Sequence, residues 1–271
     1  MPSLHPSLTQ VTTAERPGGD RPSQDRIFTT CNAVIVLDGA SHPDPADRDG
    51  RWIADRIGQE VHRRLRNEPT ADLRTTLAGA IGDTAQRHSL KPGSSPSTTV
   101  SIVRWHAGSL DVLVLCDSPV VVVDRSGTVH EIRDERLRYV NDALGRPTGF
   151  QSQNRDGWRA FVLRQQEHRN RASGYWVAEA DPRAAHHAVL ASWPLDQVMG
   201  VLAMTDGVSK GVDTYSTPPT WRDAFCVAVR DPALLVDVVH EAERSDPNGL
   251  RWPRSKRHDD KALAVVRFAA E

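Results

Sequence analysis

The sequence predicts an α+β domain in which antiparallel sheets are covered by helices. Apolar segments follow one another closely between residues 98 and 132, with too little chain between them for crossover helices. Strands joined this tightly must run antiparallel. Amphipathic segments on both sides of this region predict helices. No internal repeat or low-complexity linker divides the chain. We therefore expect one domain over residues 18–271, after a flexible lead-in over residues 1–17.

The first third of the chain combines one strand with two helices. Residues 33–37 are apolar and β-branched, which predicts a buried strand. Residues 51–66 carry apolar side chains four positions apart, the pattern of an amphipathic helix, and residues 71–88 predict a second helix. The stretch "KPGSSPS" then breaks the chain.

The remaining two thirds contain mostly strands. Closely spaced strands are expected at residues 98–105, 110–117, 120–124 and 128–132, with "DRSG" as a hairpin turn. Further elements are expected as a helix at 155–170, short strands at 175–180 and 186–191, a strand at 198–204, a helix at 232–244 and a last strand at 258–268.

The bulk composition excludes several classes of protein. The chain has 271 residues, 38% of them apolar, and a net charge of -1, so no global field draws it to nucleic acid or to an anionic membrane. No apolar run is long enough to span a bilayer, and the first residues lack the blocks of a secretory signal. Cys31, Cys116 and Cys226 lie in apolar runs without paired spacing, which indicates reduced cysteines. We expect a cytoplasmic protein.

Acidic residues stand at one end of four apolar strands. Asp38, Asp117 and Asp206 close a strand, and the pair Asp259 and Asp260 opens one. In an antiparallel sheet these ends can lie at the same edge. Each acid alone is most simply a turn residue, but four together favour a shared site. Clustered carboxylates repel one another unless a cation lies between them, and all-oxygen sites suit magnesium and manganese.

The ordered set of motifs "RPSQDR", "VLDGAS", "VLCDSP", "AMTDGVS" and "RHDDKALAVV" resembles the metal-dependent type 2C protein phosphatases. The resemblance is greatest to small actinobacterial type 2C-like proteins and runs from about residue 18 to the C-terminus. It implies a two-sheet antiparallel β-sandwich flanked by helix pairs, with metal ions at one end. It also implies a phosphomonoesterase that uses a metal-activated water for in-line attack.

The resemblance assigns roles to individual acids. Asp38 is expected to bridge two metal ions, with the Gly39 carbonyl on one of them, and Asp206 and Asp259 complete the catalytic core. Asp25 is a further acid near the site. Asp117 and Asp134 match positions associated with a third ion. The expected cofactors are two or three manganese or magnesium ions.

Several residues depart from the family pattern. Gln24 stands where a glutamate is usual, Pro119 replaces an arginine, and Ala262 replaces a threonine or serine. These changes favour an alternative in which the fold has lost turnover and serves as a binding or regulatory module. A phosphatase for a small phosphorylated metabolite is a second alternative to a protein serine/threonine phosphatase. The oligomeric state is left open.

Cations and histidines near the motifs are candidate substrate ligands. Arg21 and Arg26 flank the first motif, and His42 follows the first Asp-Gly pair, so each is a weak candidate for binding phosphate. The basic run at 251–258 is read as a loop that balances nearby acids, or as an anchor for an anionic substrate. His258, within this run, is a candidate general acid or a surface histidine. The segment 168–182 is a candidate flap over the site or a peripheral strand.

Overall fold

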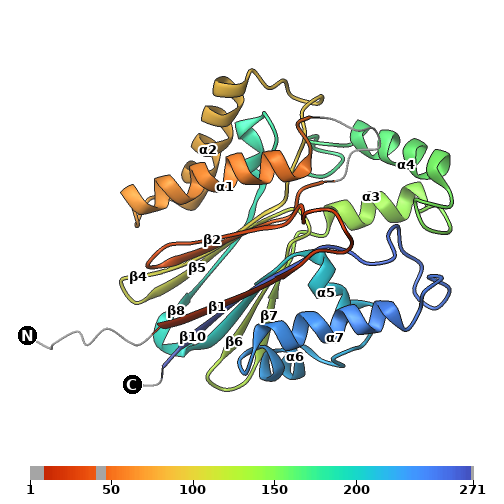
Figure 1. The fold of residues 1–271 in the computed structure, drawn as a ribbon. Coiled ribbons are helices and arrows are strands. Elements are labelled where there is room, and N and C mark those ends of the chain that lie inside the picture. The colour runs from red at the N-terminus through yellow and green to blue at the C-terminus, as the bar shows by residue number, and fades with distance from the viewer. Residues whose placement is uncertain (1–8, 41–46, 270–271) are drawn as a thin grey trace, which may run out of the picture.

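The computed structural model describes residues 9–40 and 47–269, in which two five-stranded sheets pack face to face (Figure 1). The first sheet, called the β10 sheet, has the order β1(Thr9–Arg16), β10(Lys261–Phe268), β9(Val198–Met204), β6(Val120–Asp124), β7(Val129–Ile132). The second, called the β3 sheet, has the order β2(Arg26–Thr29), β3(Ala33–Leu37), β4(Val100–His106), β5(Ser109–Leu115), β8(Val189–Pro194). All pairings between these strands are antiparallel.

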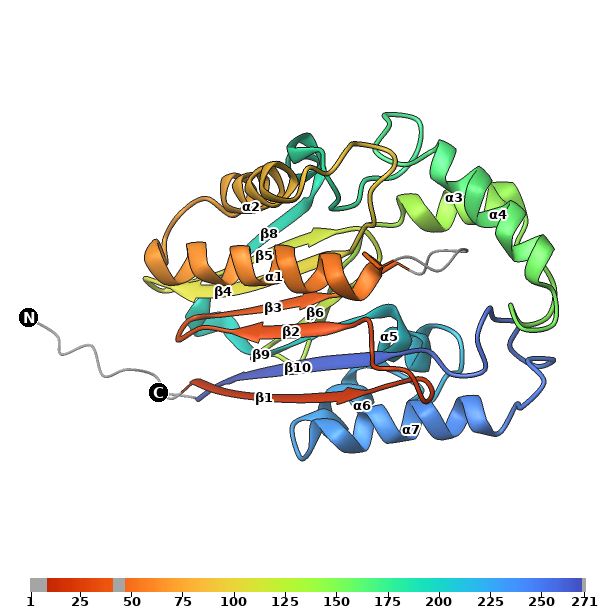
Figure 2. The ribbon, with the colours of Figure 1, turned by 45° about the horizontal axis from the view of Figure 1, so that its top comes forward.

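Helices cover the outer face of each sheet. The β3 sheet is covered by α1(Gly50–Asn67), α2(Leu73–His88) and the short helix η1(Pro182–His187). The β10 sheet is covered by α5(Asp206–Asp213), α6(Trp221–Ala228) and α7(Pro232–Arg244); the short helix η2(Leu195–Gln197) precedes β9. Two further helices, α3(Arg136–Leu144) and α4(Arg155–Glu167), lie beyond one end of the sandwich (Figure 2). The predicted α+β sandwich is therefore confirmed.

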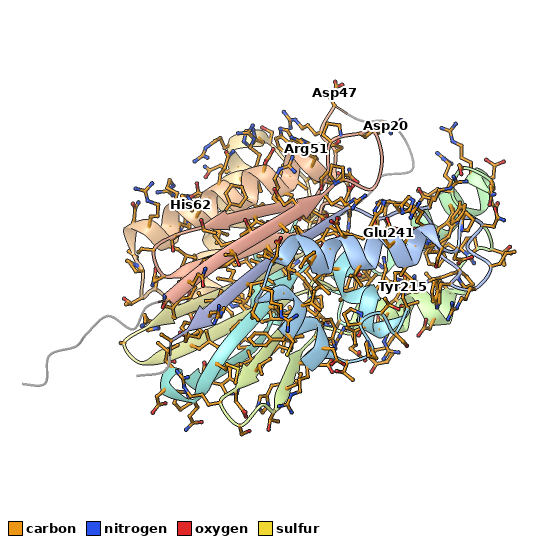
Figure 3. The ribbon with its side chains drawn as sticks, turned by 60° about the horizontal axis from the view of Figure 1, so that its bottom comes forward. Asp20, Asp47, Arg51, His62, Tyr215 and Glu241 are labelled. Carbon is orange, nitrogen blue, oxygen red and sulfur yellow. The ribbon has the colours of Figure 1, made fainter. Side chains whose placement is uncertain are left out.

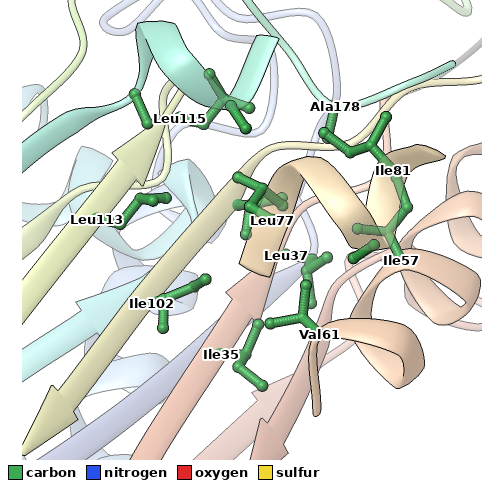
Figure 4. Close-up of a cluster of buried hydrophobic side chains, with 14 of the residues drawn as sticks. Ile35, Leu37, Ile57, Val61, Leu77, Ile81, Ile102, Leu113, Leu115 and Ala178 are labelled. Carbon is green, nitrogen blue, oxygen red and sulfur yellow. The ribbon is translucent and has the colours of Figure 1, made fainter. Parts of the chain in front are cut away.

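Strand β3 shows how the sequence builds the layers. All its residues are buried, but alternate side chains enter different cores. Val34 and Val36 point between the sheets, whereas Ile35 and Leu37 pack under α1 and α2 (Figure 4). Each fully buried aliphatic side chain contributes about 1.5–3 kcal/mol. A continuous apolar run is therefore what a strand covered on both faces requires.

The predicted helices at 51–66, 71–88 and 232–244 are confirmed, and each begins at an aspartate cap. Asp49 accepts a hydrogen bond from the Trp52 N–H at 2.9 Å, and Asp72 accepts one from the Thr75 N–H at 2.7 Å. Asp231 caps α7 in the same way. Such caps satisfy backbone N–H groups that have no partner within the helix.

Two sequence-based expectations need correction. Residues 9–16, assigned to a flexible lead-in, form the edge strand β1, whose full length pairs with β10. Its exposed residues, Gln10, Thr13 and Glu15, are polar and are separated by half-buried ones, as an edge strand allows. Residues 175–180, expected as a strand, form a loop with isolated bridges at Tyr175 and Ala178. Residues 1–8 lie outside the described part of the chain.

The sheet topology brings the ends of distant strands together. Strands β3 and β5 both pair with β4, so they run in the same direction and end at the same edge. Strand β9 ends where β10 begins, because Met204 pairs with Leu263. In the views of Figures 1 and 2, strands β3, β5 and β9 end on the side of the sandwich where α3 and α4 lie. None of the described helices combines the length and apolar character that crossing a bilayer requires.

Candidate metal centre

A cavity of about 190 Å³ opens at this edge of the sandwich. Asp38 after β3, Asp117 after β5, Asp206 after β9 and Asp259 before β10 all line it. Acids that are up to 221 positions apart therefore share one cavity wall. The structure thus brings together one acid from each of the four strand ends, and Asp260 is the one acid of that pattern outside the cavity lining.

The backbone at Asp38 is tightly fixed. Its N–H donates to Thr99 Oγ1 at 2.9 Å, and its carbonyl oxygen accepts from the Thr99 N–H and from Thr98 Oγ1, each at 2.9 Å. Behind it, Thr99 Oγ1 lies 2.5 Å from Ser118 Oγ. A hydrogen-bonded wall of hydroxyl groups therefore holds the start of the Asp-Gly motif.

Glycine is required after Asp38 by close packing. A Cβ atom on Gly39 would lie 2.3 Å from the carbonyl carbon of Gly50, the first residue of α1. Such contacts do not occur between real atoms, so a side chain here would push the helix away from the strand. The backbone of Gly39 lines the cavity beside Asp38.

Asp38 and two neighbouring acids, Asp25 and Asp117, have raised pKa values. Burial, followed by repulsion from Asp25 and Asp206, raises the pKa of Asp38 well above its usual range. Burial also raises the pKa of Asp25 to about 8, and burial together with Asp206 raises that of Asp117 to about 6. Carboxyl groups destabilised in this way are a good fit for a divalent cation, which would favour their charged forms.

The other side of the cavity already holds two ammonium groups. Lys210 Nζ lies 2.7 Å from Asp206 Oδ2 and 2.8 Å from Asp259 Oδ2. Lys256 Nζ lies 3.0 Å from Asp259 Oδ1. Burial alone would raise the pKa of Asp259, but Lys210 and Lys256 outweigh it and hold that pKa well below its usual range.

Lys210 was missed by the sequence analysis, although a signal for it exists. It stands four residues after Asp206, and that spacing places two side chains on one helix face. The helix α5 was not expected, so the pairing was not seen. Lys256 belongs to the basic run at 251–258. Its contact with Asp259, and the 2.9 Å contact between Arg254 and Asp246, confirm that this run balances nearby acids.

Asp25 lies buried behind the cavity wall. Its Oδ2 accepts a hydrogen bond from Thr205 Oγ1 at 2.7 Å, and the same hydroxyl accepts from the Ala262 N–H at 3.0 Å. Asp260 binds the backbone of the first motif instead, accepting from the Gly18 and Gln24 N–H groups at 2.7 and 3.0 Å. The N-terminal motif is therefore tied to the start of β10.

Arg51 at the start of α1 (Figure 3) holds the same motif from the other side. Its Nη1 donates to the Ser23 carbonyl at 2.9 Å. Arg26 also points toward α1, where its Nε lies 2.6 Å from Asp55 Oδ1. The structure thus gives Arg26 a role in joining strand and helix, and does not bring it to the cavity.

The remaining substrate candidates do not reach the cavity within the described chain. Arg21 is exposed and is not part of the cavity lining. His42 lies in residues 41–46, outside the described residues. The Nδ1 atom of His258 lies 3.2 Å from Glu243 Oε2, and its ring stacks on His240 with centroids 4.1 Å apart. His258 is therefore engaged behind the site, away from the cavity.

Asp134 occupies a different place from the one expected for a ligand of a third ion. Its side chain is 2% exposed and pairs with Arg136 at 2.6 Å. It also accepts a hydrogen bond from the Cys116 N–H at 3.0 Å. Asp134 is not part of the cavity lining. Its geometry fits a residue that positions the backbone just before Asp117.

The outer wall of the cavity comes from segments that the strand-end acids did not reveal. Helices α3 and α4 are joined by a hydrogen bond from Gln165 Nε2 to Asn141 Oδ1 at 2.7 Å. The wall includes Leu137, Asn141, Arg146, Gln151, Trp158, Phe161, Val162, Gln165, Tyr175 and Val177. The expected flap at 168–182 supplies the last two of these. A partly apolar roof therefore stands opposite the carboxylates.

Comparison with known proteins agrees with this arrangement. The chain matches the family model described as protein phosphatase 2C over residues 17–233. No curated protein matches it.

Among solved structures, PppA, described as a regulatory component of T6SS in Pseudomonas aeruginosa, has a TM-score of 0.57 at 17% identity, covering 97% of this chain and 99% of that chain. The Mycobacterium tuberculosis serine/threonine phosphatase PstP gives 0.53 at 16% identity, with 96% and 98% covered. The PstP catalytic domain has also been solved with two manganese ions. A bacterial serine phosphatase gives 0.65 at 13% identity, with 97% and 99% covered. At these identities the likeness shows the fold.

Proposed function

Because the chain belongs to the protein phosphatase 2C family, we propose that it is a metal-dependent phosphomonoesterase acting on phosphoserine or phosphothreonine in proteins. One observation carries this proposal: four acids, Asp38, Asp117, Asp206 and Asp259, line one cavity, and their negative charges outnumber the three cations in its lining, Arg146, Lys210 and Lys256. Half-buried carboxylates clustered in this way are a costly arrangement that a cation-binding function explains.

The groups that would hold manganese or magnesium are the carboxylates of Asp38, Asp206 and Asp259 and the carbonyl of Gly39, with Asp117 beside them. These are oxygen donors, which both ions prefer. When bound, the ions would polarise the phosphate and activate a water for in-line attack. The Asp-Gly backbone would keep the donors in place through its bonds to Thr98 and Thr99.

Cations of the chain itself would attract the phosphate. Arg146 lines the cavity from the loop after α3, and its side chain is exposed. A guanidinium group can donate two parallel hydrogen bonds to two phosphate oxygens. Because Arg146 lines the cavity and Arg21 and Arg26 do not, Arg146 is the better candidate for binding phosphate. Lys256 also lines the cavity. Trp158, Phe161 and Val162 on α4 would shield the reacting group from bulk water.

The size of the cavity limits what enters it. About 190 Å³ accommodates a phosphorylated side chain, with the rest of a protein substrate outside. The solved relatives described as serine/threonine phosphatases support this substrate class. A small phosphorylated metabolite would use the same carboxylates, and activity measured on both phosphopeptides and phosphometabolites separates the two.

The test is hydrolysis of p-nitrophenyl phosphate by the purified protein with and without manganese. We expect manganese-dependent turnover that Asp38→Ala and Asp206→Ala each lower by about a hundredfold or more, since each removes a proposed ligand. The control is Asp237→Asn on α7, which alters an exposed ion pair with Arg16 of β1 and should leave turnover unchanged. Manganese binding without turnover on any phosphoester would contradict the proposal.

One observation favours a second candidate, a binding or regulatory module without turnover. Both carboxylate oxygens of Asp259 are already engaged by lysine side chains. An acid held in this way is less available to a metal ion. The same assay decides between the two, because a binding module would show no manganese-dependent hydrolysis.

A further inference from the structure

Lys210 lies where a cation between two acids would be expected. Its Nζ is within 2.8 Å of both Asp206 and Asp259, which come from the ends of different strands. The lysine and Asp206 lie on the same face of α5, one turn apart. The ammonium therefore links β9 and β10 across the cavity edge.

Asp259 has no free carboxylate oxygen in this arrangement. Lys210 contacts its Oδ2, and Lys256 contacts its Oδ1 at 3.0 Å. A divalent ion that ligates Asp259 therefore competes with an ammonium group for the oxygen that it binds. By contrast, no ion pair within the described residues joins Asp38 or Asp117 to a lysine or arginine side chain, whereas Asp206 and Asp259 have such pairs.

We infer that Lys210 is a built-in competitor for divalent cations, so that ions ligated by Asp206 and Asp259 bind more weakly than an ion held on the Asp38 side. The inference rests on the metal centre of the proposed function and adds a residue that sets its occupancy. The ligand class is a divalent cation with a preference for oxygen, such as magnesium or manganese.

The competition follows from tethering and charge. The ammonium is attached to α5, so its effective concentration at the two carboxylates is high without any free ligand. A divalent ion carries twice the charge but must lose part of its hydration shell to enter. The side chain of Lys210 is 24% exposed, which leaves the ammonium a path to solvent when it is displaced.

The first test is manganese binding to the full chain, measured by calorimetry and by metal analysis after dialysis. For Lys210→Gln we expect either one more bound ion per chain or an affinity of the weakest site raised at least about tenfold. Lys210→Arg keeps the positive charge and should bind manganese as the unaltered chain does. Lys91→Gln, at an exposed position away from the cavity, is the matched control for loss of a lysine.

Equal stoichiometry and affinity in Lys210→Gln and the unaltered chain would overturn the inference. Removing the ammonium leaves Asp206 and Asp259 less compensated, so the glutamine variant can lose stability without metal. In that case Lys210→Met, which keeps the apolar stem of the side chain, is purified with manganese. Its manganese stoichiometry and affinity are then compared with those of the unaltered chain. A second test uses the unaltered chain and does not depend on the stability of these variants.

The second test follows the lysine ammonium groups by proton–nitrogen correlation spectra during titration with magnesium. The chain has only four lysines, Lys91, Lys210, Lys256 and Lys261, so their signals can be assigned by single substitutions. We expect the Lys210 signal to shift or vanish as magnesium binds, while that of Lys261, buried against Glu243, stays. A Lys210 signal unchanged at saturating magnesium would refute displacement.

These readouts are separate from catalysis. If the chain hydrolyses no phosphoester but Lys210→Gln gains manganese, the inference stands and the proposed function fails. If the chain is an active phosphatase and Lys210→Gln binds manganese unchanged, the proposed function stands and the inference fails.

Discussion

Gly207 lies so close to Asp260 that a Cβ atom added to it would approach the Asp260 carbonyl oxygen to 1.9 Å. This contact joins the first turn of α5 to the start of β10, directly beside the cavity acids. It explains physically why glycine follows the aspartate in the second Asp-Gly pair. The same requirement holds for Gly39 against Gly50.

Gly207→Ala should therefore destabilise the fold by about 2–4 kcal/mol, because overpacking against backbone forces the strand or helix to move. Urea denaturation followed by circular dichroism measures the loss. The matched control is Gly82→Ala in α2, where the added carbon would meet only Pro182 Cγ, at 3.4 Å. There, alanine should stabilise the helix by about 0.5–1 kcal/mol. Equal effects at both glycines would contradict the explanation.

A buried ion pair supports the loop before Asp259. Glu243 and Lys261 are both 0% exposed, with Nζ and Oε2 2.6 Å apart, and Tyr215 (Figure 3) donates to Glu243 at 3.3 Å. Lys261→Met should cost about 3–5 kcal/mol, since it leaves the Glu243 carboxylate buried without its main partner. Thermal and urea unfolding measure this loss.

The control for this prediction lies on the same helix. Glu241 (Figure 3) pairs with Arg244 at the surface, with both side chains more than half exposed. Glu241→Gln should change the free energy of unfolding by less than about 0.5 kcal/mol. If Lys261→Met also changed the free energy of unfolding only slightly, the predicted cost of breaking the buried ion pair would be wrong.

Much of the fold was predictable because its strands are apolar runs with abrupt ends. The change from Val-rich segments to aspartate at Asp38 and Asp206 marks both the strand end and the acid, so the location of the acidic cluster followed from the same signal. Strand β1 was missed because its sequence, "TQVTTAER", is half polar, as an edge strand with one exposed face allows.

The parts of the site that escaped prediction depend on tertiary packing. Helix α5 contains Gly207 and Gly211, which lower helix propensity, so the pairing of Lys210 with Asp206 one turn away had no visible helix to support it. Helix α3 was not expected. A helix at 155–170 was expected and is found as α4, but its sequence does not indicate that it covers the cavity. Spacing along the chain does not reveal which loop such helices will cover.

Asp111 supplies a pH-dependent contribution to stability. Its burial opposes ionisation, but hydrogen bonds from Arg104, Ser192 and His106 outweigh this and lower its pKa from 3.8 to about 2. A carboxyl with a lowered pKa stabilises the fold above the unfolded-state value, and this contribution is lost as the pH falls toward the folded-state value.

Asp111→Asn should therefore destabilise the chain by about 1 kcal/mol at neutral pH, after allowance for solvent screening. The difference from the unaltered chain should shrink as the pH falls from about 4 toward 2. Urea denaturation at several pH values measures it. Asp142→Asn, at an exposed position on α3, should show no such trend. A difference that stays constant down to the lowest accessible pH would refute the role of ionisation.

Asp134 distinguishes a metal ligand from a positioning residue. In the structure its carboxylate binds Arg136 and the Cys116 N–H, one residue before Asp117. Asp134→Ala should cost about 1–3 kcal/mol, because it leaves the Cys116 N–H without its acceptor and a guanidinium without its partner. The number of manganese ions bound should stay that of the unaltered chain.

Asp117→Ala, which alters the cavity wall itself, should instead lower manganese binding. Calorimetry on both variants, with unfolding curves as a check on folding, separates the two roles. Loss of one ion from the Asp134 variant would restore the third-site role that its sequence position implied.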